Sequence, residues 1–147
     1  MDFRKATLED VPALAELRKQ QLIDEGLLPL QNIDAQLKHY FSRCLMDASF
    51  IGWLAIDGAI IATSGLCFYQ LPPSYANPSG KIAYITNVFT VKTHRRQGIA
   101  SILLDKILQE VRIQGVSVVR LHASSDGKDL YAKFGFSPAE GYMALNL

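Results

Sequence analysis

One stretch of the chain constrains the fold more than any other: residues 87–101, which read NVFTVKTHRRQGIAS. The stretch begins among apolar and β-branched residues, passes through a short polar loop and reaches Gly98. The apolar residues that follow recur at helical spacing, at Ile99, Ile102, Leu103, Ile107 and Val111. A strand, a tight loop and a long amphipathic helix in this order predict a layered domain in which helices cover a sheet.

The other segments fit the same class of fold. Thr7 followed by Asp10 resembles a capping box at the start of a helix, and Asp57-Gly58 predicts a hairpin turn. We expect strands at residues 2–6, 49–56, 59–70, 81–91, 116–122 and 143–147. We expect helices after Thr7, after Asp34, and over 98–114 and 126–134. The order β-α-α-β-β-β-α-β-α-β predicts one α/β domain, residues 1–147, with a mixed sheet and helices on both faces.

Composition narrows the classes of function. The chain has 147 residues, of which 49% are hydrophobic, so its core needs no disulfide, and we expect Cys44 and Cys67 to be reduced core residues. No apolar run approaches the ~20 residues of a membrane span, and the start lacks a signal peptide, so we expect a cytoplasmic protein. A net charge of +1 argues against nucleic acid as the main partner. The sequence leaves the assembly open, including a homodimer.

The polar loop before the long helix predicts an anion site. The first N–H groups of a helix have no partner within the helix, and they lie at the positive end of its dipole. Gly98 has no side chain, so a pyrophosphate can lie directly against the backbone there. Arg95 and Arg96 add positive charge. The two other common phosphate motifs, G-x-x-x-x-G-K-[ST] and G-x-G-x-x-G after a strand, are absent from the sequence.

Two motifs together resemble the GNAT superfamily of acetyltransferases. The family signature [Arg/Gln]-x-x-Gly-x-[Gly/Ala] occurs at residues 95–100, and a segment similar to Leu-Tyr-x-x-x-Gly-Phe occurs at residues 130–136. The resemblance implies an N-acetyltransferase that moves the acetyl group of acetyl-CoA to a primary amine of a small molecule, peptide or protein. No metal is expected, because the three histidines have no ligand spacing. A non-catalytic acyl-CoA-binding or regulatory module stays open as the alternative.

The resemblance also implies roles for particular residues. The strand backbone at Phe89, Thr90 and Val91 should meet the pantetheine arm, and an N–H of Phe89 or Val91 should stabilise the oxyanion. Tyr131 should protonate the departing thiolate. Ser124 or Ser125 should replace the asparagine that many relatives use to bind the cofactor, or should cap the short helix. The pyrophosphate cradle should consist of Arg96, Gln97, Gly98, Ile99, Ala100 and Ser101.

The general base and the acceptor are less defined. Many relatives carry a glutamate on one of the two central strands, but residues 84–91 and 116–122 contain no acid. His122 ends its strand and could act as the base, although a structural role is equally open, and Asn87 could instead position a relay water. Asp24 and Glu25 lie near the loop between the first two helices and could attract a cationic amine, although a solvated, charged helix end is the plainer interpretation of each.

Overall fold

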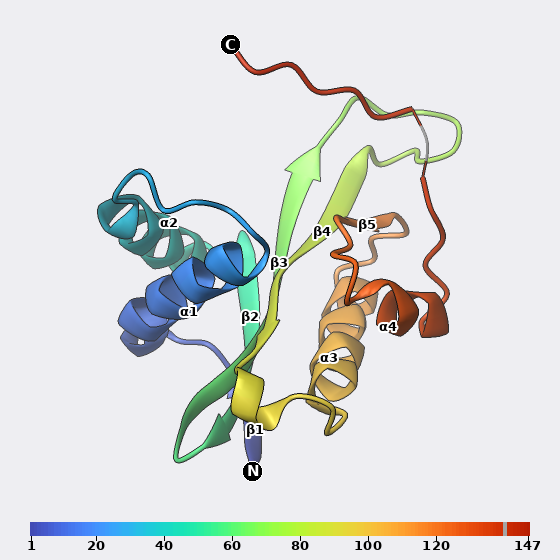
Figure 1. Cartoon of the computed structure of the whole chain (residues 1–147). Coiled ribbons are helices and arrows are strands. Elements are labelled where there is room, and N and C mark those ends of the chain that lie inside the picture. The colour runs from blue at the N-terminus through green and yellow to red at the C-terminus, as the bar shows by residue number, and fades with distance from the viewer. Residues whose placement is uncertain (140) are drawn as a thin grey trace.

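The computed structural model describes residues 1–139 and 141–147. Its core is a five-stranded sheet whose strand order follows the chain (Figure 1). The strands are β1 (Asp2–Lys5), β2 (Phe50–Asp57), β3 (Ala59–Gln70), β4 (Lys81–Thr90) and β5 (Val119–Leu121). The helices are α1 (Val11–Asp24), α2 (Asp34–Met46), α3 (Ile99–Ile113) and α4 (Lys128–Lys133), with short 3-10 turns at Leu8–Asp10 and Lys92–His94.

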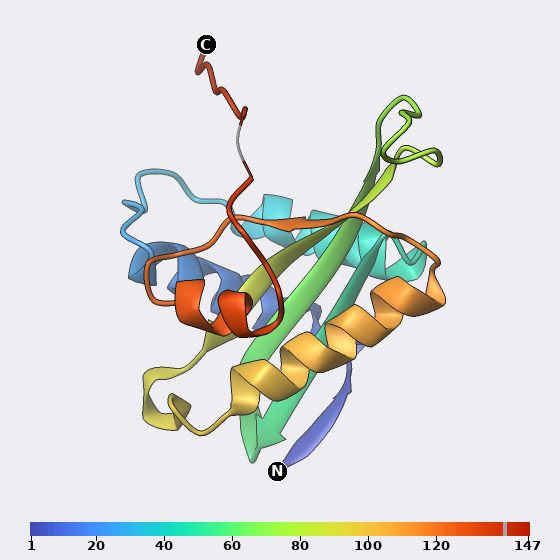
Figure 2. The same ribbon diagram turned by 90° about the vertical axis from the view of Figure 1, so that its right-hand side faces the viewer.

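The sheet is mixed, as the sequence predicts. β1 to β4 pair antiparallel, whereas β5 pairs parallel to β4 after the chain has crossed over through α3. α1 and α2 cover one face of the sheet, and α3 and α4 lie on the other (Figures 1 and 2). The predicted α/β fold class with helices on both faces is therefore confirmed.

Each face of the sheet has its own apolar core. On the α3 face, Leu104 and Ile107 are fully buried against strand residues such as Leu66. On the opposite face, the rings of Phe41 and Phe50 meet edge to face with their centroids 5.2 Å apart. Burying side chains on both faces fixes the register of the central strands, because a slip by one residue would exchange their inward and outward positions.

A β-bulge interrupts β4 toward its C-terminal end. Thr63 of β3 lies opposite Phe89 and Gly65 lies opposite Thr86, so Asn87 and Val88 together face a single residue of β3. Asn87 has φ +55°, in the left-handed region, and its carbonyl accepts a hydrogen bond of 2.7 Å from the Thr63 hydroxyl. The pairing with β5 ends at Ile85, two residues before the bulge. From the bulge onward, β4 therefore has a strand partner on the β3 side alone.

The predicted strand at residues 143–147 is wrong. Residues 141–147 have no regular structure, and Figure 1 shows this tail leaving the body of the domain. Met143 is 94% exposed and Leu145 is 82% exposed. The apolar pattern predicted a strand, but a strand also requires a neighbour with free backbone groups, and sequence pattern carries no information about that neighbour.

The start of the first helix gives a testable pH dependence. The predicted capping box forms: Asp10 accepts hydrogen bonds from the Thr7 N–H at 2.7 Å and from Arg4 at 2.7 and 2.9 Å. The Arg4 guanidinium lowers the pKa of the buried Asp10 carboxyl below its usual value. A lowered folded-state pKa stabilises the fold above the unfolded-state value of about 4, and this contribution is lost as the pH falls through the folded-state pKa.

We therefore expect Asp10→Asn to lower the free energy of unfolding at pH 7, with a difference from wild type that shrinks below about pH 4. Urea denaturation of both proteins at pH 7 and pH 3 measures the difference. A difference that stays constant between the two pH values would contradict the assignment.

Candidate functional site

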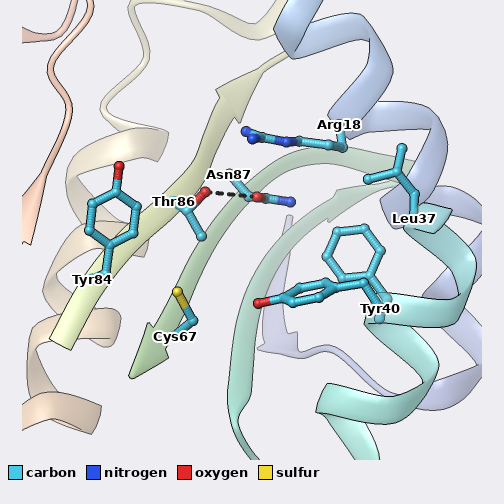
Figure 3. A pocket seen from close by; sticks show the side chains of 8 residues that line it. Arg18, Leu37, Tyr40, Cys67, Tyr84, Thr86 and Asn87 are labelled. Atoms are coloured by element: carbon cyan, nitrogen blue, oxygen red, sulfur yellow. Dashed lines mark hydrogen bonds between the residues drawn. The ribbon is translucent and has the colours of Figure 1, made fainter. Parts of the chain in front are cut away.

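Two adjoining cavities lie between the α1–α2 layer and β4. The β5-side cavity has a volume of about 220 Å³, and its lining includes Tyr131 and His122. The α2-side cavity has a volume of about 200 Å³ and reaches toward Tyr40 and Cys67 (Figure 3). The residues that line both cavities are Arg18, Tyr84, Thr86 and Asn87. The bulge of β4 thus stands where the two cavities meet.

α1 provides a polar wall to the β5-side cavity. Arg18, Gln21 and Glu25 lie three and four residues apart, on one face of the helix and its C-cap. Arg18 donates a hydrogen bond of 3.2 Å to the Gln21 amide oxygen, and Gln21 donates one of 3.1 Å to Glu25. Only Glu25 of this wall was predicted as a site residue, although the helical spacing of the three polar residues is visible in the sequence.

Tyr131 lies in the lining of the β5-side cavity. It projects from α4 into the β5-side cavity with 8% of the residue exposed, and its ring packs edge to face on Phe136. Burial, followed by the negative charge of Glu25, raises the pKa of Tyr131 above its ordinary value. Its hydroxyl makes no hydrogen bond to any residue that the structure describes. The phenol is therefore protonated at neutral pH and free to donate.

Gly127 makes room for that ring. A Cβ at position 127 would lie 2.8 Å from Cε2 of Tyr131, closer than side chains pack, while φ of −91° suits any residue. We expect Gly127→Ala to displace the tyrosine and to lower kcat by on the order of 10- to 100-fold, because misplacing a group that acts in the reaction by about 1 Å can cost up to about 100-fold. Steady-state kinetics test this, with Lys133→Ala as the control because Lys133 is an exposed residue of the same helix and lines neither cavity. Equal kcat in wild type and Gly127→Ala would show that the ring position is not critical.

His122 lies beside a tyrosine that the sequence analysis missed. Nδ1 of His122 and the hydroxyl of Tyr84 are hydrogen-bonded, and the two rings meet edge to face at 5.7 Å. Burial raises the pKa of Tyr84, so the phenol keeps its proton. In the tautomer with hydrogen on Nδ1, the imidazole donates to Tyr84 and its Nε2 keeps a free lone pair.

The loop before α3 has the geometry of an anion cradle. Gly98 is the N-cap of α3 with φ +79°, and a Cβ there would meet no protein atom within 4 Å. The N–H groups of the first helical turn, from Ile99 to Ser101, have no partner within the helix. Arg96 and Gln97 are exposed beside them. This open turn of backbone donors fits the pyrophosphate of a nucleotide ligand.

Arg95 has a different place. Its Nε donates to the Thr90 carbonyl at 2.8 Å, and its guanidinium pairs with Asp24 at 3.1 Å. Asp24, considered above as an attractor for the amine, is therefore held by an arginine and lines neither cavity. Ser125 also lines neither cavity, whereas Ser124 lines the β5-side cavity.

Along β4, the backbone N–H groups point alternately toward β3 and toward the edge that has no strand partner. The Val91 N–H donates to the carbonyl of Ile61 at 2.9 Å, so it is not free to serve as the oxyanion donor expected from the sequence. Because antiparallel partners alternate in direction, the N–H of Phe89 also turns toward β3 and that of Thr90 turns away from it. Thr90 therefore offers its backbone to a ligand lying along the unpaired edge of β4.

Tyr131, His122, Ser124, Asn87 and Glu25 were expected from the sequence, and all five line the β5-side cavity. The residues missed are Arg18, Gln21, Tyr84, Ile85, Thr86 and Val88. Within residues 1–139 and 141–147, no three metal-ligating side chains gather at one point. None of the helices in that part of the chain has the length and apolar character needed to cross a membrane.

Comparison with known proteins places these features in a family. The family model described as an acetyltransferase (GNAT) domain matches residues 2–139. A crystal structure, with acetyl-CoA, of a predicted acetyltransferase from Clostridium acetobutylicum is 38% identical with a TM-score of 0.95, covering 99% of this chain and 95% of the other. A GCN5-related N-acetyltransferase from Ralstonia eutropha is 26% identical with a TM-score of 0.90, covering 99% and 97%.

More distant similarity extends to the fold alone. Glucosamine-6-phosphate N-acetyltransferase from Arabidopsis thaliana is 17% identical with a TM-score of 0.76, covering 99% of this chain and 97% of the other. The search among curated proteins found no match. The family match spans both sequence motifs and the elements that carry the cavities. The chain therefore belongs to the GNAT acetyltransferase family.

Proposed function

We propose that the protein is an N-acetyltransferase that moves the acetyl group of acetyl-CoA to a primary amine by direct attack. The β5-side cavity carries this proposal. It brings Tyr131, protonated and without a hydrogen-bond partner in the described residues, and the imidazole of His122 to the edge of β4 that β5 leaves open. The relative from Clostridium acetobutylicum, whose structure contains acetyl-CoA, supports the choice of donor.

The donor would span the cradle and the open strand edge. We assign the pyrophosphate to the backbone of residues 96–101, where the first turn of α3 offers unpaired N–H groups. We assign the pantetheine arm to the edge of β4 at residues 88–90, where it adds as an extra strand would. Ser124, in the lining of the β5-side cavity, is within the same region and contributes a hydroxyl. Acetyl-CoA supplies the acetyl group as its thioester.

The side chains then move two protons. Nε2 of His122 takes a proton from the attacking amine, with Nδ1–H held by Tyr84, and Asn87 at the bulge orients the amine or a relay water. The new bond joins nitrogen to the acetyl carbon, and the carbon–sulfur bond breaks. A β4 N–H turned away from β3 stabilises the negative charge on the carbonyl oxygen. Tyr131 gives its proton to the departing sulfur.

Ligand binding and turnover test the proposal separately. Acetyl-CoA at about 100 times its dissociation constant should raise the free energy of unfolding by about 2.7 kcal/mol. Thermal or urea denaturation with and without acetyl-CoA measures this, and release of CoA thiol against pooled amines, amino acids and peptides measures turnover. Folded protein that acetyl-CoA does not stabilise would refute the proposal. Stabilisation without turnover on any amine would instead identify a binding module.

A further inference from the structure

The part of the α2-side cavity beyond Tyr84 and Asn87 takes no part in the proposed acetyl-transfer chemistry, yet it opens from the point where the amine must lie. Its outer wall is apolar and comes from α2 and β3 (Figure 3). Phe41 is 2% exposed, and its ring meets those of Tyr40 at 5.5 Å and Phe50 at 5.2 Å. Burial raises the pKa of Tyr40, so this ring is neutral as well. Edge-to-face packing fixes the wall, which suits an apolar group of the acceptor.

Arg18 stands at the mouth of this apolar compartment. Figure 3 shows its side chain extending from α1 over Thr86 and Asn87 at the bulge. It is the one formally charged side chain in the lining of the α2-side cavity, and it also lines the β5-side cavity. Within residues 1–139 and 141–147 it forms no ion pair, and its hydrogen bond goes to the neutral amide of Gln21.

An arginine with a single hydrogen bond to a neutral amide has further N–H donors available for a ligand. The guanidinium has five N–H donors in a planar fork, and the fork matches the two oxygens of a carboxylate. The two arginines that pair with an acid in the described residues, Arg4 with Asp10 and Arg95 with Asp24, lie outside the linings of both cavities. Arg18 is therefore the side chain through which an anionic group of the acceptor would be recognised.

We propose, resting on the transferase function above, that the acceptor is a small aminocarboxylate with an apolar side chain, such as an apolar α-amino acid. Its carboxylate pairs with Arg18 and its side chain enters the α2-side cavity. Its amine, one carbon from the carboxylate, then lies beside Asn87 at the junction with the β5-side cavity. The volume of about 200 Å³ lies below the usual ~300–1,000 Å³ of ligand pockets, so the compartment fits one side chain and not a long acyl or polycyclic group.

Matched pairs of acceptors test the carboxylate directly. L-phenylalanine is compared with 2-phenylethylamine, and L-leucine with 3-methylbutylamine, by kcat/KM from release of CoA thiol. In the wild-type protein, kcat/KM should be at least about tenfold higher for each amino acid than for its matched amine. A hydrogen bond to a charged group is typically strong enough to produce a ratio of this size. Arg18→Met should lower kcat/KM for the amino acids by a similar factor and for the amines much less. Arg43→Met, an exposed change on α2 that lies outside both linings, should leave both values unchanged.

A second substitution tests the apolar compartment. Leu37→Phe adds bulk to the lining of the α2-side cavity, so it should raise KM for L-phenylalanine more than for L-alanine. A binding measurement that does not depend on turnover completes the experiment. N-acetyl-L-phenylalanine should bind the CoA-loaded wild-type protein more tightly than N-acetyl-2-phenylethylamine, by calorimetry, and Arg18→Met should remove the difference.

The outcomes separate this inference from the function on which it rests. Amines acetylated as well as their amino acids, or a preference that survives in Arg18→Met, would overturn the carboxylate assignment and leave the acetyltransferase intact. Equal effects of Leu37→Phe on both amino acids would overturn the place of the side chain. A wild-type protein that fails to bind acetyl-CoA would overturn the proposed function and this inference with it.

Discussion

Replacing Tyr131 with phenylalanine is expected to lower kcat by on the order of 100-fold or more, because positioned acid catalysis is typically worth that much. The change removes one hydroxyl and keeps the ring that packs on Phe136. That hydroxyl has no hydrogen-bond partner in the described residues, so the free energy of unfolding should change little. Acetyl-CoA affinity should also change little, since the proton matters as charge develops on sulfur. Both kcat and kcat/KM should therefore fall together.

Steady-state kinetics, calorimetric binding of acetyl-CoA and a denaturation curve are the three measurements needed for Tyr131→Phe. Tyr75→Phe is the matched control, since Tyr75 is fully exposed in the loop between β3 and β4. Full activity of Tyr131→Phe would make Tyr131 a packing residue and would leave protonation of the thiolate to water. A loss of activity accompanied by unfolding would show that the residue acts through stability alone.

Gly98→Asp should weaken acetyl-CoA binding by on the order of 100-fold, because juxtaposed like charges cost several kcal/mol. The new carboxylate would stand where a Cβ meets no protein atom, at the start of α3 and beside the expected pyrophosphate. φ of +79° adds strain of roughly 1–2 kcal/mol for most residues other than glycine, and less for aspartate, whose short polar side chain can hydrogen-bond locally. The folded domain should persist, since the position is exposed.

Gly98→Ala separates the two causes. Alanine shares the strained φ with aspartate but adds no charge, so it should cost stability and much less affinity. Calorimetric titration of acetyl-CoA into the three proteins gives the comparison, and circular dichroism verifies that each is folded. If Gly98→Asp bound acetyl-CoA as tightly as wild type, the phosphate site would lie elsewhere.

Much of the fold could be predicted because it depends on local patterns. The helical spacing of Ile99, Leu103 and Ile107 predicted α3 almost to its ends, and Asp57-Gly58 marked the hairpin between β2 and β3. The tail at residues 143–147 could not be predicted correctly, because a strand depends on a neighbour elsewhere in the chain. The bulge at Asn87 was missed for a similar reason, since register is a property of two strands.

The residues of the candidate site also fall into two groups, those that a local sequence pattern reveals and those that only the packing brings together. Gly98 and Tyr131 lie within contiguous motifs, so a linear sequence suffices to find them. Arg18 and Tyr84 lie 66 positions apart in the numbering and meet at the cavities through the packing of α1 on the sheet. No spacing along the chain signals such a meeting. The direction of the Val91 N–H likewise depends on the ladder between β3 and β4, which the sequence does not specify.

Because the β4–β5 pairing ends early, amide hydrogen exchange along β4 should differ between the free protein and the protein with bound ligand. From Ala83 to Ile85, the strand has a partner on both sides, so its amide hydrogens should exchange with solvent slowly. Beyond the bulge, the outward amide of Thr90 has no strand to protect it and should exchange quickly until acetyl-CoA lies alongside. One strand thus contains a segment whose amides are protected with or without ligand and a segment whose amides become protected when acetyl-CoA binds. Amide exchange in the second segment therefore measures how much of the protein has acetyl-CoA bound.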